Sequence, residues 1–308
     1  MQSSEAAAKQ ELTNVAITPV EYHGWPGSYL ISNGVAEVIV VPAIGRVMQF
    51  RMAGNEAGVF WENRLLDGQL PAAPEVEWTN FGGDKPWPAP QDEWGKVTGR
   101  PWPPPLAFDS MALEATVEGR ELVLSSSVDP DYGIRTVRHV SLHPTKARLA
   151  IRTAYHKVSG PAVKTGVWII TQLHDPERVF ALLPEELKRA PGFYQMQGPA
   201  PYDFEHSGRL ISLKRDPANN LKIGAEGNTL LWIGKEYVLR IDHDSSAGAT
   251  SIYTNMDPLR YVELETEGPL MELNSGDCVE MTSMYQLMRR TTLDVRAEAH
   301  RALGLAHD

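Results

Sequence analysis

Two glutamates spaced two residues apart, Glu263 and Glu265, are the best candidates for acid–base chemistry in this sequence. They lie in residues 261–269, whose alternation predicts a β-strand. Alternate residues of a strand share a face, so both carboxylates and Tyr261 point one way, and the aliphatic residues between them point toward the core. Carboxylates arranged in this way bind hydroxyl groups or transfer protons, although an ordinary solvated face has the same pattern.

Aromatic and polar side chains are concentrated in residues 78–109, which contain four of the eight tryptophans. Indole rings suit a sugar, because its C–H faces stack on them while nearby polar groups bond its hydroxyls. The alternative is that the rings cap one end of a β-sandwich core, since indoles bury readily. The candidate ligand-binding residues in this segment are Asn80, Asp84, Lys85, Trp87, Gln91 and Trp94.

Seven prolines interrupt the same segment, at positions 86, 88, 90, 101, 103, 104 and 105. Proline fixes φ and lacks the backbone donor, so we expect neither a helix nor a central strand here. Disordered segments are poor in aromatic residues, which argues against disorder. We therefore predict an ordered loop in which Trp87 and Trp94 face a ligand and Trp102 is structural.

A third group of candidates lies in residues 166–175. Alternation places Trp168 and Gln172 on one face of a predicted strand, and His174 ends that strand, where its side chain can reach a cleft. A histidine in a cleft can act as a general acid. The commoner role of a single histidine at a strand end is that of a surface or capping residue, so both interpretations stay open.

The sequence lacks the motifs of several large functional classes. It has no Gly-rich nucleotide loop, no nucleophile elbow and no paired-histidine zinc motif, so we predict neither a cofactor nor a metal site. The net charge of -10 and the lack of a basic run are not those of a nucleic-acid binder. No apolar run approaches the ~20 residues of a membrane span. Cys278 is the single cysteine, which excludes an intrachain disulfide.

The elements that must position these candidates are strands, because period-2 patterns dominate the chain. A dozen or more short strands separated by close turn signals predict an all-β sandwich or barrel. Leu293–Leu305 alone has a good helical pattern, with Thr292 as the expected N-cap. We divide the chain into a flexible N-terminal leader (1–19), a β domain (20–290) and a C-terminal helix (291–308).

Several stretches together resemble the galactose mutarotase-like superfamily, and they extend over roughly residues 20–290. The resemblance is closer to a bacterial branch of that superfamily than to the true aldose 1-epimerases. It implies a β-supersandwich of two large antiparallel sheets with a sugar-sized concave groove. The matching stretches are Gly45-Arg-Val-Met-Gln-Phe50, Asn80-Phe-Gly-Gly-Asp-Lys-Pro-Trp87, Trp168-Ile-Ile-Thr-Gln172, Tyr261-Val-Glu-Leu-Glu-Thr-Glu-Gly-Pro-Leu270 and Leu273-Asn-Ser-Gly-Asp277.

The resemblance also implies roles for two residues. In the epimerases of this superfamily, a glutamate takes the proton of the anomeric hydroxyl group and a histidine protonates the ring oxygen. Leu264-Glu265-Thr266 resembles the segment of the base, which points to Glu265, and residues 171–174 lie where the acid segment belongs, which points to His174. The family's Asn-Arg pair is replaced here by Asn80-Phe81, so other activities of the fold stay open.

The leading hypothesis is a protein that binds a mono- or oligosaccharide in the groove and performs aldose 1-epimerase-like chemistry at the anomeric centre. A first alternative is a glycoside hydrolase or lyase with paired carboxylates, for instance Asp84 with Glu263 or Glu265. A second alternative is a non-catalytic carbohydrate-binding module. A histidine and a glutamate that converge on one ring-sized space would favour the epimerase, and opposed carboxylates would favour the hydrolase.

Overall fold

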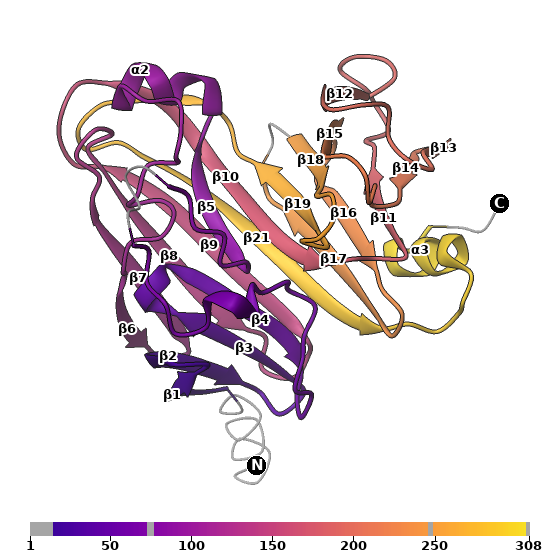
Figure 1. Ribbon diagram of the computed structural model, residues 1–308, viewed down its shortest axis with the longest axis horizontal. Helices are drawn as coiled ribbons and strands as arrows, with labels where there is room; N and C mark the ends of the chain where they lie inside the picture. Colours follow the sequence, from indigo (N-terminus) through magenta and orange to yellow (C-terminus); the bar gives the residue numbers. More distant parts are fainter. Residues whose placement is uncertain (1–14, 73–76, 246–248, 306–308) are drawn as a thin grey trace, which may run out of the picture.

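Two antiparallel sheets of 11 and 10 strands make up the fold in this computed structural model, which describes residues 15–72, 77–245 and 249–305. The first sheet has the order β1-β2-β3-β4-β5-β10-β19-β18-β15-β12, with β20 paired to β10. The second has the order β13-β14-β11-β16-β17-β21-β9-β8-β7-β6. In Figure 1 the early strands β1–β8 lie at one end of the molecule, and β11–β18 lie with α3 at the other.

The strands of the 11-stranded sheet are β1 (Ala16–Tyr22), β2 (Trp25–Ser32), β3 (Ala36–Val41), β4 (Arg46–Met52), β5 (Asp84–Ala89), β10 (Val163–His174), β12 (Phe193–Gln197), β15 (Leu221–Glu226), β18 (Ala249–Thr254), β19 (Tyr261–Glu267) and β20 (Met271–Leu273). Those of the 10-stranded sheet are β6 (Glu114–Glu118), β7 (Glu121–Val128), β8 (Ile134–Leu142), β9 (Arg148–Lys157), β11 (Arg178–Leu182), β13 (Glu205–Ser207), β14 (Leu210–Leu213), β16 (Thr229–Ile233), β17 (Tyr237–His243) and β21 (Cys278–Arg289). The helical segments are η1 (Pro42–Ile44), η2 (Arg64–Leu66), η3 (Gln91–Glu93), α2 (Trp94–Thr98) and α3 (Val295–Leu303).

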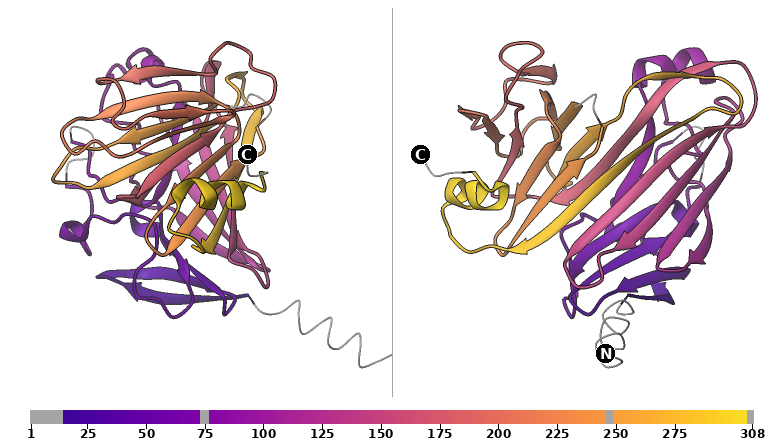
Figure 2. Two further views of the ribbon diagram at one scale, coloured as in Figure 1. Left: turned by 90° about the vertical axis from the view of Figure 1, so that its right-hand side faces the viewer. Right: turned by 180° about the vertical axis from the view of Figure 1, so that it is seen from behind.

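The main hydrophobic core lies between the two sheets. Val262 and Leu264 of β19 and Leu239 and Ile241 of β17 all belong to it and are fully buried. We call the face of each sheet that is turned toward this core its inner face, and the opposite face its outer face. The longest strands, β10 and β21, have 12 residues each, and Figure 2 shows β21 (yellow) extending from the end of α3 far into the other half of the molecule.

The predicted all-β supersandwich with one short C-terminal helix is confirmed. The helix is shorter than expected, because Asp294, rather than Thr292, is its N-cap and accepts hydrogen bonds from the backbone N–H groups of Arg296 and Ala297. Strand β1 begins at Ala16, so the last residues of the predicted leader are part of a sheet. Residues 1–14 of that leader lie outside the described residues.

Strand β5 corrects the expectation that the proline-rich segment holds no central strand. It lies between β4 and β10 and includes Pro86 and Pro88. The prolines are tolerated because β5 pairs with β10 along its whole length but with β4 only through Asp84 and Val47. On the β4 side the strand is nearly an edge, where a missing N–H costs no ladder hydrogen bond. The segment also contains α2, which the proline pattern did not predict.

Candidate functional site

Strand register gathers several predicted residues on the outer face of the 11-stranded sheet. Ile170 of β10 lies opposite Lys85 of β5 on one side and opposite Glu265 of β19 on the other. Two residues further along β10, Gln172 lies opposite Glu263. Paired positions of antiparallel strands share a face, so these side chains are neighbours. On the other side of β19, Ser251 of β18 lies opposite Glu265 and Tyr253 lies opposite Glu263. Lys222 of β15 in turn lies opposite Tyr253.

Glu265 is enclosed, and one oxygen of its carboxylate accepts hydrogen bonds from three donors. Its Oε2 atom accepts from Trp168 Nε1 at 2.7 Å, from Lys222 Nζ at 2.6 Å and from Ser251 Oγ at 3.0 Å. Burial opposes the charge of Lys222, but the attraction of Glu265 outweighs burial, so the pKa of Lys222 is raised. Lys222 and Glu265 therefore form a close, buried ion pair.

Glu263 has fewer partners on the same face. Its Oε1 atom accepts from Gln172 Nε2 at 2.8 Å and lies 4.0 Å from Lys85 Nζ. Its side chain keeps 13% of its surface exposed, and its Oε2 atom accepts no hydrogen bond from the described parts of the chain. Burial raises the pKa of Glu263 to about 7, although the nearby charge of Lys85 lowers it. Of the two predicted carboxylates, Glu263 is thus the one that can both accept and donate a proton near neutral pH.

Lys85 is a buried amine without a full set of partners. Its Nζ atom makes no hydrogen bond to the described residues, and its single ion-pair partner there is Glu263. The atom also lies 5.3 Å from the ring centre of Trp87 and 5.7 Å from that of Trp78. Burial lowers the pKa of Lys85, and the charge of Glu263 only partly opposes this effect.

The tryptophans divide into those beside the site and those behind it. Asp109 fixes the first group, because its Oδ1 atom accepts from Trp87 Nε1 at 2.8 Å and from Trp78 Nε1 at 3.4 Å. Trp94 was expected to face a ligand, but it is fully buried behind Trp87 and donates to the backbone oxygen of Pro88 at 2.8 Å. Trp102, expected to be structural, is 43% exposed.

An aromatic pair closes the His174 end of the polar cluster. The ring centres of Trp61 and Tyr261 are 4.6 Å apart, and Asn80 Nδ2 donates to the Tyr261 hydroxyl at 3.3 Å. Trp61 and Tyr261 lie on opposite sides of β10, so their rings meet above Gln172, which is fully buried. Tyr261 and Asn80 therefore belong to the wall of the site, as does Trp61, which the sequence did not single out.

His174 does not converge with Glu265. It lies opposite Tyr261, four residues along β10 from the position opposite Glu265, which corresponds to roughly 13 Å along a strand. It is exposed beyond the Trp61–Tyr261 pair and lines a separate cavity of about 540 Å³. Surrounding groups exclude part of its water, and this loss of solvation lowers the pKa of His174.

Two further candidates lie away from the cluster. Asp84 is on the inner face, where it pairs with Arg138 and accepts from Thr171 Oγ1 at 2.8 Å and from the Tyr285 hydroxyl at 2.5 Å. Strand alternation explains this, because Asp84 directly precedes Lys85 in β5. Gln91 is exposed in η3, past the end of β5. The predicted pairing of Asp84 with Glu263 or Glu265 across a groove is therefore absent.

Lys222 and Ser251 complete the cluster but were not predicted from the sequence. Each lies in an ordinary alternating strand, and only the strand order places it beside Glu265. In residues 15–72, 77–245 and 249–305, no three His, Cys, Asp or Glu side chains are grouped as a metal ion requires. The helices within those ranges are all too short or too polar to cross a membrane.

Comparisons with known proteins establish the fold. No protein-family model and no curated protein sequence matches the chain. Among solved structures, a galactose mutarotase-like protein from Lactobacillus casei superposes with a TM-score of 0.60 at 9% identity, over 85% of this chain and all (100%) of that one. A galactose mutarotase-like protein from Clostridium acetobutylicum gives 0.58 at 9% identity, over 90% and 99% of the two chains. A galactose mutarotase related enzyme from Lactobacillus acidophilus gives 0.54 at 12%, over 87% and 98%. The chain therefore has a galactose mutarotase-like fold.

Proposed function

We propose that this chain binds a sugar on the outer face of the 11-stranded sheet and that Glu263 transfers a proton at its anomeric centre. The observation that carries the proposal is the partly exposed carboxyl group of Glu263 beside the buried amine of Lys85, which makes no hydrogen bond to the described residues; burial also raises the pKa of this carboxyl group to about 7. Lys85 offers an amine that makes no hydrogen bond to the described residues, and the half-buried ring of Trp78 beside it suits a sugar C–H face.

The reaction needs only one proton-transfer group. In its ionised form, Glu263 takes the proton of the anomeric hydroxyl, the C1=O bond forms, and the C1–O5 bond breaks. The same carboxyl then gives its proton to O5, because both oxygens are bonded to one carbon and lie within reach of one side chain. Rotation about the C1–C2 bond and ring closure by the reverse steps yield the other anomer. Glu265 accepts hydrogen bonds from Lys222 and Trp168 and keeps both side chains in place.

The test is anomer exchange of freshly dissolved hexoses and hexuronic acids, followed by polarimetry and by NMR. The native chain should accelerate exchange of at least one sugar over buffer. Glu263→Gln keeps the shape and removes the proton-transfer group, so it should lower this acceleration ~100-fold or more. Glu267→Gln is the matched control, since Glu267 lies on the same strand and face and its pKa is also raised by burial.

The pH profile gives a second readout. Because the first step needs ionised Glu263, the rate should rise as pH increases through about 7. A full rate in the Glu263→Gln variant would reject the proton-transfer role. Binding of a sugar without any acceleration would favour the non-catalytic binding module, and no binding of any sugar would reject the proposed function as a whole.

A further inference from the structure

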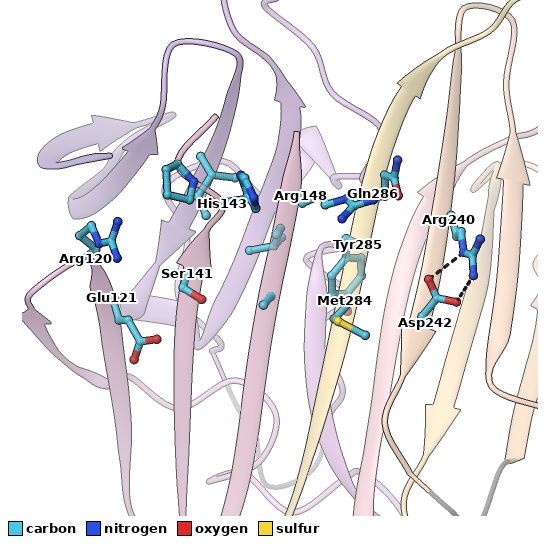
Figure 3. Close-up of a pocket in the computed structure, with 14 residues that line it drawn as sticks. Arg120, Glu121, Ser141, His143, Arg148, Arg240, Asp242, Met284, Tyr285 and Gln286 are labelled. Carbon is cyan, nitrogen blue, oxygen red and sulfur yellow. Dashed lines mark hydrogen bonds and ion pairs between the residues drawn. The ribbon is translucent and has the colours of Figure 1, made fainter. Parts of the chain in front are cut away.

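A cavity also lies on the outer face of the 10-stranded sheet, on the far side of the sandwich from Glu263. Its volume is about 750 Å³, within the ~300–1,000 Å³ typical of small-molecule sites. Figure 3 shows its lining side chains rising from neighbouring strands. They come from β7, β8, β9, β21 and β17, from the turn before β7, which contributes Arg120, and from the turn after β8.

Strand register gives this cavity a small, flat floor. One row of paired positions crosses the five strands in the order Glu121, Ser141, Ala150, Met284 and Asp242. Short side chains and one exposed methionine thus form the centre of the floor, and a carboxylate stands at each end. Such a row offers an apolar patch to a ring face and polar groups to hydroxyls around it.

The adjacent row forms a basic side wall. Gln286 lies opposite Arg148 on one side and Arg240 on the other, and Arg148 Nη2 donates to Gln286 Oε1 at 3.1 Å. Arg240 is neutralised by Asp242, with contacts of 2.8 and 2.9 Å (Figure 3). Arg148, in contrast, has no carboxylate within ion-pair distance among the described residues. Its exposed guanidinium is therefore a cation of this cavity that can bind an anion.

From these features we infer that the cavity is a second ligand site, for a saccharide that carries one carboxylate. The flat floor takes the ring, Ser141 and Gln286 bond its hydroxyls, and Arg148 binds the carboxylate as a bidentate pair. The carboxylate of Glu121 at one end of the floor disfavours a polyanion such as a nucleic acid. The inference does not depend on the function proposed for Glu263.

The test is calorimetric titration with cellobiouronic acid, a glucuronic acid–glucose disaccharide, and with cellobiose as its neutral match. The native chain should bind the acid at least about tenfold more tightly than cellobiose. Arg148→Met should remove this preference, and Ala150→Phe, which fills the floor, should abolish binding of both. Arg152→Met is the matched control, because Arg152 lies on the same face of β9 as Arg148, four residues further along, outside the cavity and paired with Glu280.

Binding here must also survive Glu263→Gln, which separates it from the site on the other sheet. Equal affinity for the acid and for cellobiose would overturn the inference, as would an Arg148→Met variant that binds the acid as tightly as the native chain does. Failure of the acid to bind at millimolar concentration would overturn it as well.

Discussion

Asp84 and Lys85 are adjacent in β5, both are fully buried, and yet their surroundings differ completely. Asp84 points to the inner face, where Arg138, Thr171 and Tyr285 all donate to its carboxylate. Lys85 points to the outer face, where its amine has no hydrogen bond from the described residues and one glutamate at 4.0 Å. Strand β5 thus carries two buried ion pairs that differ in their hydrogen bonding. The carboxylate on its inner face accepts from three side chains, whereas the amine on its outer face makes no hydrogen bond to the described residues.

The difference indicates what each charge contributes. When one partner of a well hydrogen-bonded ion pair between two sheets is removed, the other charge stays buried without compensation, and the fold is destabilised. An unsaturated buried amine beside a carboxyl group with a raised pKa contributes little to stability, and it offers hydrogen bonds to a ligand. We therefore expect variants on the inner face to affect folding and those on the outer face to affect sugar chemistry.

The largest expected effect is that of Asp84→Asn on folding. The amide keeps the shape of the side chain but leaves the Arg138 charge unpaired between the sheets, which should lower the free energy of unfolding by about 3–5 kcal/mol. Urea denaturation measures this change. Asp92→Asn is the control, since Asp92 is exposed in η3 and should leave the unfolding midpoint unchanged. A loss below about 1 kcal/mol would show that the Asp84–Arg138 pair is dispensable.

The next effect is a change in the pH dependence of stability in Glu263→Gln. The folded pKa of Glu263 is about 7 against an ordinary 4.5, so between these values the native chain binds a proton that the unfolded chain has lost. Stability of the native chain should therefore fall as pH rises from 4.5 to about 7. Of this fall in the free energy of unfolding, on the order of 3 kcal/mol is due to Glu263, and the Glu263→Gln variant should not show that share. Parallel stability curves for the two proteins would contradict the raised pKa.

The smallest effect on stability is expected for Lys85→Met. Methionine fills a similar volume and removes a poorly paired buried amine, so the free energy of unfolding should change by no more than about 1 kcal/mol. The pKa of Glu263 should rise further, because the charge of Lys85 lowers it. Unfolding and sugar binding are both measured. A destabilisation as large as that of Asp84→Asn would erase the distinction between the two faces.

The sequence was sufficient to predict the fold class, because alternation over many short strands has few other solutions. It predicted the shared face of Glu263, Glu265 and Tyr261 correctly, since that face follows from period 2 within a single strand. The sequence was misleading for β5. Proline generally disfavours a central strand, but one side of β5 is almost unpaired, so its prolines cost no ladder hydrogen bonds there.

The sequence could not rank the two glutamates. Glu265 accepts hydrogen bonds from Lys222 and Ser251, which belong to β15 and β18. The order of strands in the sheet brings these donors to Glu265, and a single sequence segment does not encode that order. The same limit explains why Asp84 was grouped with Lys85 and why His174 was expected to face Glu265. Proximity along the chain suggested the first grouping and the resemblance suggested the second, whereas face and register decide both.

The most direct test of the account is a titration of the Glu263 carboxyl carbon by ¹³C NMR, with the Glu263→Gln variant used to assign the signal. We predict an apparent pKa near 7 in the free protein, displaced when a sugar that binds is present at saturation. A pKa close to the ordinary 4.5, unchanged by the sugar, would contradict the assignment of Glu263 as the proton-transfer group.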